Sequence, residues 1–172
     1  MRQFMLVFLI ALFLLSACME GINKPKSTHA GDFAMEMRIV ELVNESRVKG
    51  RKCGGAYYKA VQPLAWNDML GQAALAHSLD MAQNGFLSHT GSDGSNPGIR
   101  LSKTGYTWRI FGENIGQGYR TPEEAVQGWL RSEEHCRNIM NPEFREAGAA
   151  FAKSGNLRNY WTIVFGTPRQ NR

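Results

Sequence analysis

The chain ends in two strand-like runs joined by a short loop, and its long helical patterns all lie before them. The runs REAGAAFAK (145–153) and NYWTIVFGT (159–167) are rich in apolar residues, and SGNLR between them is typical of a hairpin loop. Helices first and strands last, without βαβ alternation, favour an α+β domain. We therefore expect helices that cover a mostly antiparallel sheet.

Cap residues and the spacing of apolar residues predict where the helices begin and end. Apolar residues recur near helical spacing in 33–49. Asn67 is a suitable N-cap for a second helix that runs to about residue 84 and stops at Gly85. Thr121 and Pro122 open a further helix with a capping box. Two shorter elements are expected between them, a helix near 99–103 and a strand at 108–116.

The N-terminus has the features of an export signal. Arg2 precedes an apolar run, 4–15, that is shorter than the roughly 20 residues needed to span a bilayer. It fits a secretory signal instead. The following LSAC resembles the lipobox of bacterial lipoproteins, in which Cys18 is acylated, with palmitate for example, and becomes the first mature residue. The alternative is cleavage after Ala17 that leaves Cys18 an ordinary thiol.

The lipobox interpretation divides the chain into three parts. Residues 1–17 are a lipoprotein signal peptide, 18–32 a lipidated tether and 33–172 one domain. The protein is then exported and anchored to a membrane of the cell envelope through its lipid. An aspartate that would resemble an inner-membrane retention signal does not follow Cys18, which favours the outer membrane in a Gram-negative organism.

Charge gives a weaker signal. The formal net charge is +5, and the densest basic run is RVKGRK, 47–52. These cations could contact an anionic surface, but they also lie where a helix should end, and there they interact favourably with the helix dipole. We favour the second interpretation. Basic stripes interleaved with aromatics, zinc-finger spacings and RNA-binding motifs are absent from the sequence, so nucleic acid is not an expected partner.

The remaining cysteines form an even pair. With Cys18 assigned to the lipid, Cys53 and Cys136 are expected to form a disulfide in an exported protein. Such a cross-link stabilises a fold by roughly 4 kcal/mol in the chain-entropy model. The alternative is a nucleophilic Cys136 beside His135, which an oxidising compartment opposes because the nucleophile must be a reduced thiolate.

Common catalytic signatures are missing, namely G-x-S-x-G, H-E-x-x-H, the P-loop and C-x-x-C. Three polar spots remain at the ends of expected elements. They are FLSHTGSDG around His89, GENI around Glu113 and SEEHCRNIM around His135. His77 lies inside the second helix, where a histidine is most often a partner for a neighbouring side chain, so we place it outside the site.

These motifs, together with PLAWNDMLGQAALAHSLDMA, EAGAAF and YWTIVFG, resemble in their order the CAP superfamily (SCP or cysteine-rich secretory proteins), and its bacterial branch above all. The resemblance covers roughly residues 38–167. It implies an α-β-α sandwich with a cleft lined by two histidines and acidic residues, which holds a divalent metal in some members. His89, Glu113 and His135 match the cleft motifs and are the candidate catalytic or metal-binding residues.

The sequence departs from the family pattern near the second histidine. Animal members have a second glutamate three residues after a tryptophan, where this chain has Ser132. Bacterial relatives usually read Gly-His-Arg, whereas Glu134 and Cys136 flank His135 here. Either the site is incomplete, or Glu133 or Glu134 supplies the missing carboxylate. A solvated helix end is the favoured interpretation of these two glutamates.

Three functions fit these residues. The first is a monomeric binding module whose cleft receives a small lipid, glycan or peptide. The second is a hydrolase in which two imidazoles and a carboxylate hold a divalent metal, zinc above all, or act as acid and base. The third is a cleft that only joins sheet ends by hydrogen bonds. We favour binding, because the sequence offers no residue with the marks of an activated nucleophile.

Overall fold

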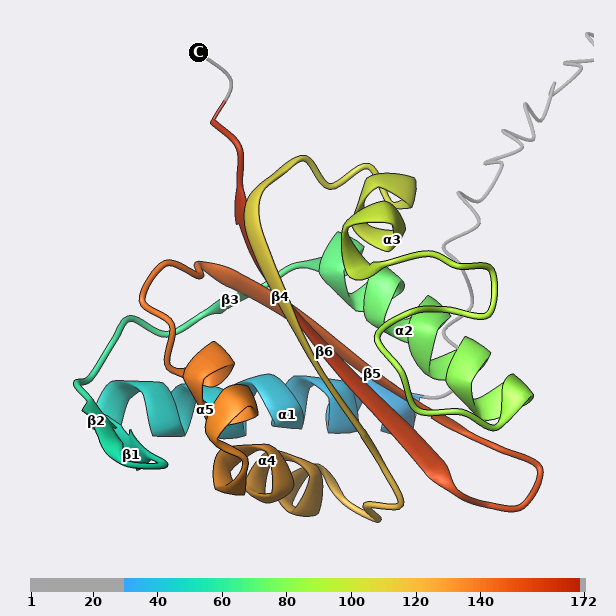
Figure 1. Cartoon of the computed structure of the whole chain (residues 1–172), viewed down its shortest axis with the longest axis horizontal. Coiled ribbons are helices and arrows are strands. Elements are labelled where there is room, and N and C mark those ends of the chain that lie inside the picture. The colour runs from blue at the N-terminus through green and yellow to red at the C-terminus, as the bar shows by residue number, and fades with distance from the viewer. Residues whose placement is uncertain (1–29, 171–172) are drawn as a thin grey trace, which may run out of the picture.

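The computed structural model describes residues 30–170, and these form three layers (Figure 1). A sheet of four strands lies in the middle. Helices α2 (Asp68–Asn84) and α3 (Pro97–Lys103) cover one face. Helices α1 (Ala30–Lys49), α4 (Pro122–Arg131) and α5 (Glu133–Ile139) cover the other. The expected α+β class and the α-β-α sandwich are confirmed.

The sheet is mostly antiparallel, with strand order β3-β5-β6-β4. Strands β5 (Glu146–Lys153) and β6 (Asn159–Pro168) form the predicted hairpin, and β4 (Trp108–Gln117) pairs with β6 at the edge. The two-residue β3 (Ala65–Trp66) runs parallel to β5. A separate ribbon joins β1 (Arg51–Cys53) to β2 (Ala56–Tyr58). We predicted neither β3 nor this ribbon, because two or three residues are too few to show strand periodicity.

The helix caps follow the sequence signals. The Asn67 side chain accepts hydrogen bonds from the backbone N–H of Met69 and Leu70, and Gly85 ends α2 in the left-handed conformation at φ 70°. The Thr121 side chain caps α4 in the same way. Helix α1 begins at Ala30, so its first turn lies in the segment that we assigned to the tether. The leader, Cys18 and most of that tether lie outside the described residues.

Alternation along β5 and β6 divides the core in two. Trp161, Ile163 and Phe165 point toward α1, α4 and α5 and belong to the larger apolar cluster. Thr162 and Val164, on the opposite face, point toward α2. Within residues 30–170, no helix is both long and apolar enough to cross a membrane.

Arg47 departs from its expected role. It lies in the last turn of α1, but its guanidinium is fully buried and donates hydrogen bonds to four carbonyls, those of Gln62, Ile139, Asn141 and Phe144. Burial lowers the pKa of Arg47 to about 10. Arg47 therefore joins the end of α1 to the end of α5, and it is not available to an anionic surface.

The predicted disulfide is present. Cys53 on β1 and Cys136 on α5 are bonded, with 5.5 Å between their Cα atoms. Both cysteines are buried. The bond ties the β1–β2 ribbon to the helix that carries His135, and a bonded Cys136 is not a free thiolate.

Candidate functional site

The buried carboxylate of Glu113 is the centre of the polar site. Glu113 lies in the middle of β4 and points toward the α2–α3 layer, and only 2% of its side chain is exposed. Its Oε1 atom lies 2.7 Å from Nδ1 of His89, and its Oε2 atom accepts a hydrogen bond of 2.8 Å from Arg100. Both carboxylate oxygens therefore have charged or polar partners within the protein.

His89 lies in the loop between α2 and α3 with its ring facing solvent. About half of the side chain is exposed (52%), in contrast to Glu113. The contact with a carboxylate favours the proton on Nδ1, which leaves Nε2 as an acceptor. This arrangement orients the imidazole, as a carboxylate orients the base of a catalytic triad. The structure thus joins two of the three predicted site residues.

Two residues outside the predicted site hold the His89 loop in place. Arg100 on α3 donates to the carbonyl of His89 as well as to Glu113. His77 on α2 is fully buried, and its Nε2 lies 2.8 Å from the carbonyl of Ser88 and 3.9 Å from Glu113 Oε1. Burial lowers the pKa of His77, despite the opposing charge of Glu113. His77 is thus a neutral ring that fixes the residue before His89.

Sequence reasoning missed Arg100 and set His77 aside. Arg100 belongs to a short helix, and its spacing from Glu113 carries no recognisable motif. The expectation that a helical histidine partners a neighbouring side chain applies to His77, but its partners are a site residue and the site loop. The sequence signal for His77 was its place as a polar residue among the apolar residues of one helix face, where a polar residue is expected to be buried and to need a partner.

His135 approaches the site from the other layer. It lies on α5, and its backbone carbonyl accepts a hydrogen bond of 3.0 Å from Asn114, the neighbour of Glu113 on β4. Burial lowers the pKa of the His135 ring, and a positive charge on His89, when that ring is protonated, acts in the same direction. The His135 ring is therefore within electrostatic reach of His89, although no hydrogen bond within residues 30–170 joins it to Glu113.

Ser132, Glu133 and Glu134, the ambiguous candidates, lie where α4 ends and α5 begins. Glu133 and Glu134 are exposed in the first turn of α5, and the Glu133 carboxylate lies against Gly54 of the β1–β2 turn. Ser132 separates α4 from α5, and its side chain makes no capping bond. Neither glutamate contacts Glu113 in the part of the chain that the structure describes. These positions are consistent with a solvated helix end.

Among the described residues, this arrangement does not form a complete ligand set for a divalent metal. Across residues 30–170, no group of three or more His, Cys, Asp or Glu side chains is placed to hold a metal ion. In addition, the cationic Arg100 occupies one oxygen of Glu113, which is the one buried carboxylate in the part of the chain that the structure describes. What the site offers chemically is an oriented imidazole with one free nitrogen, which can bind a donor group or accept a proton.

Comparisons with known proteins agree on one family. Residues 40–165 match the family model of CAP, the cysteine-rich secretory protein family. The uncharacterized protein YkwD of Bacillus subtilis (strain 168) is 32% identical over 149 residues, which are 87% of this chain and 53% of YkwD. The chain thus spans about half the length of that relative.

Solved structures show the same fold. An extracellular protein containing an SCP domain from Bacillus anthracis str. Ames has a TM-score of 0.68 and 27% identity, over 78% of this chain and 41% of that one. An outer surface protein from Borrelia burgdorferi has a TM-score of 0.67 and 21% identity, over 77% of this chain and 92% of that one. These neighbours are extracellular or surface proteins by description.

Proposed function

This chain belongs to the CAP family of cysteine-rich secretory proteins, and from that premise we propose that it is an envelope-anchored binding module. Its His89–Glu113 site holds the polar group of a small lipid, glycan or peptide. The observation that carries the proposal is the 2.7 Å contact between His89 Nδ1 and a carboxylate that is almost fully buried. It leaves an oriented, half-exposed imidazole whose Nε2 can accept a hydrogen bond from a ligand.

Binding is favoured over hydrolysis because the described residues supply an oriented base but no nucleophile beside it. Cys136 is bonded to Cys53 in the disulfide and is therefore not available as a nucleophile. The hydroxyls of Ser88 and Ser92, near the same loop, contact the backbone of Thr90 and the side chain of Asp80. A hydrolase would need an activated nucleophile or a metal-bound water at this place.

The experiment is native mass spectrometry of the protein purified from its own envelope. A mass above that of the protein identifies a co-purified ligand. We expect the ligand with the wild type and not with His89→Ala, because the substitution removes the imidazole without touching the core. Tyr57→Ala is the control, since Tyr57 is 68% exposed on the β1–β2 ribbon, which contributes no residue to the His89–Glu113 contact. Equal ligand occupancy in His89→Ala would contradict the proposed cleft.

The anchor is tested separately. In the lipobox interpretation the acyl group on Cys18 holds the protein to the membrane, so Cys18→Ser should move it from the membrane fraction to the soluble fraction. A Cys18→Ser protein that still sediments with membranes after a high-salt wash would refute the anchor. The result does not depend on the cleft.

A further inference from the structure

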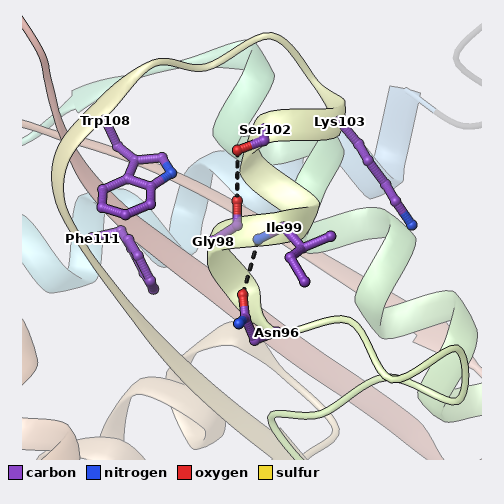
Figure 2. Close-up of a pocket in the computed structure, with 7 residues that line it drawn as sticks. All are labelled: Asn96, Gly98, Ile99, Ser102, Lys103, Trp108 and Phe111. Carbon is purple, nitrogen blue, oxygen red and sulfur yellow. Dashed lines mark hydrogen bonds between the residues drawn. The ribbon is translucent and has the colours of Figure 1, made fainter.

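A second pocket lies beside α3, separate from the His89 ring. It has a volume of about 540 Å³, within the range of small-molecule sites. Figure 2 shows its walls, with Trp108 and Phe111 of β4 on one side and Ile99 of α3 on the other. Asn96 and Lys103 lie at the two ends of α3. No role is assigned to this pocket by the CAP motifs in the sequence.

The aromatic wall is held in a defined orientation. The rings of Trp108 and Phe111 meet edge to face, with 4.6 Å between their centroids and 77° between their planes. The Phe111 ring also packs against the backbone of α3 at Gly98, where an added Cβ would lie 3.1 Å from the ring. A wall fixed in this way can receive a flat apolar face of a ligand at little cost in side-chain entropy.

The wall carries an unused hydrogen-bond donor. Three of the four indole N–H groups have protein acceptors, which are Asp68 for Trp66, Ile115 for Trp129 and Tyr119 for Trp161. The indole N–H of Trp108 has no acceptor among residues 30–170. In Figure 2 its nitrogen points across the pocket toward Ser102.

Other polar groups surround this donor. The Asn96 side chain uses its oxygen to cap α3, so its amide nitrogen keeps both N–H groups without an acceptor in the described part of the chain. The Ser102 hydroxyl donates to the carbonyl of Gly98 and can still accept. The Lys103 ammonium pairs with Asp93 at 2.9 Å, in solvent. The pocket thus combines aromatic walls with neutral donors, and its one cation is already paired.

This combination selects a class of ligand. A hydrocarbon chain would strip water from the indole and amide N–H groups without replacing their hydrogen bonds. An anionic group would find only an exposed ammonium that is already paired, and such pairs contribute little. A sugar ring with an N-acetyl group offers an apolar face for the aromatic wall and a carbonyl oxygen for the indole N–H.

We propose that this pocket binds the ring of a neutral N-acetylated sugar within a glycan. The indole N–H of Trp108 donates to the acetamido carbonyl, and the Asn96 amide donates to a ring hydroxyl. The inference stands apart from the His89 site, because His89 and its ring partner Glu113 are not among the residues that line the pocket. The two sites can therefore fail or succeed independently.

The test uses the full-length protein labelled with ¹⁵N at tryptophan. The probe is the β-1,4-linked tetramer of N-acetylglucosamine, and cellotetraose, with the same linkage but no acetamido group, is the matched ligand. NMR reports which indole N–H signal moves, and calorimetry reports affinity. We expect a saturable shift of the Trp108 signal alone, and cellotetraose should bind at least tenfold more weakly.

Variants locate the interaction. Trp108→Phe keeps an aromatic ring but loses the donor, and it should weaken binding of the tetramer at least tenfold. Trp66→Phe is the matched control, because it removes another partly exposed indole on the distant β3, and its affinity should stay within twofold of the wild type. His89→Ala should also stay within twofold, which separates this pocket from the cleft. Circular dichroism confirms that each variant is folded.

Several outcomes would overturn the assignment. They are no saturable shift at millimolar tetramer, equal affinity for cellotetraose, or wild-type affinity in Trp108→Phe. Laurate and a short neutral peptide serve as competing probes. If either moves the Trp108 signal and the tetramer does not, the pocket is a site for a lipid or a peptide, and the sugar proposal is wrong.

Discussion

The two helical layers pack against opposite faces of the same sheet, and they differ in the side chains that they bury there. The layer of α1, α4 and α5 packs large side chains such as Trp129 and Phe144 and carries the disulfide. The layer of α2 and α3 packs alanines and glycines close to the sheet and buries polar groups between them. These buried polar residues are His77, Ser78, Ser95, Arg100, Glu113 and Thr162.

The layer of α1, α4 and α5 contributes mainly to stability, whereas the layer of α2 and α3 surrounds the carboxylate of the candidate site. A layer of large apolar contacts with a cross-link remains rigid with few buried polar groups, of which the Arg47 guanidinium at the ends of α1 and α5 is the largest. It can therefore support a second layer in which buried polar groups are arranged around one carboxylate, although such groups stabilise little and are costly when unpaired. Glu113 and Asn114, adjacent on β4, point to opposite faces and connect the two layers.

The largest effect is expected in the apolar layer. Trp129 is 1% exposed and its indole donates to the carbonyl of Ile115, so Trp129→Ala leaves a large cavity and an unpaired carbonyl. We expect a loss of about 3–5 kcal/mol in unfolding free energy, measured by urea denaturation. Trp108→Ala, at a half-buried position beside the other layer, should cost clearly less. Equal losses would remove the distinction between the layers.

Close packing in the α2 layer gives the next effect. A Cβ on Gly148 would collide with the backbone of Gly71 and Leu70, so Gly148→Ala forces α2 away from the sheet. We expect a loss of about 1–3 kcal/mol in the same assay. Gly155→Ala is the control, because an added Cβ there meets nothing within 4 Å, and it should change stability by less than about 0.5 kcal/mol. If Gly148→Ala leaves the unfolding free energy unchanged, the contact between β5 and α2 is not tight enough to limit the side chain at this position.

Acid should weaken the polar layer through His77. Its pKa is lowered in the folded state, so the folded protein stays neutral at this ring while the unfolded chain takes up a proton below pH about 6.5. His77 therefore contributes stability that is present above that pH and is lost as pH falls toward the folded pKa. The loss per histidine reaches at most about 1.4 kcal/mol per pH unit.

The measurement is the difference between two stability curves. Urea denaturation of wild type and of His77→Gln between pH 5 and 8 should show a shallower acid loss in the variant, whatever its stability at pH 8. The difference removes contributions from other groups, such as Glu36, whose pKa burial raises to about 7. Parallel curves would mean that His77 is not the titrating group.

The smallest effect is expected for the affinity of the candidate site for zinc. The sequence-based hypothesis predicts a weak site at His89, Glu113 and His135 that fades below pH about 6, where histidine is protonated. Because Arg100 pairs with Glu113, Arg100→Gln should strengthen zinc binding by freeing one carboxylate oxygen. Calorimetry should show weaker binding in His89→Ala and His135→Ala. Equal binding by all four proteins, or none by Arg100→Gln at neutral pH, would reject this site.

Much of the fold could be predicted because its signals are local. The caps at Asn67, Gly85 and Thr121, and the hairpin of β5 and β6, each depend on a few adjacent residues. Short elements could not be found in this way. The ribbon of β1 and β2 exists because the disulfide and the turn at Gly54 hold it, and α5 is too short to show helical periodicity.

The site was predictable to the extent that its residues lie in motifs. His89 and Glu113 were both singled out, and the structure places them in contact. Arg100 could not be found, because a cation on a short helix looks like any solvated cation until its distance to a buried carboxylate is known. Arg47 was expected to be a solvated cation at a helix end, but its guanidinium is buried and donates to backbone carbonyls. Its neighbours in sequence give no sign of this burial.

The sequence by itself determined the class of the fold, the positions of most caps, the pairing of Cys53 with Cys136 and the family. Each of these depends on residue type and spacing along the chain. The tertiary structure alone decided that Arg100 occupies the Glu113 carboxylate, that His77 supports the His89 loop, and that Trp108 faces a pocket with its donor unused. The physical reason is that ion pairs, burial and unpaired donors depend on distances between segments that are far apart in sequence.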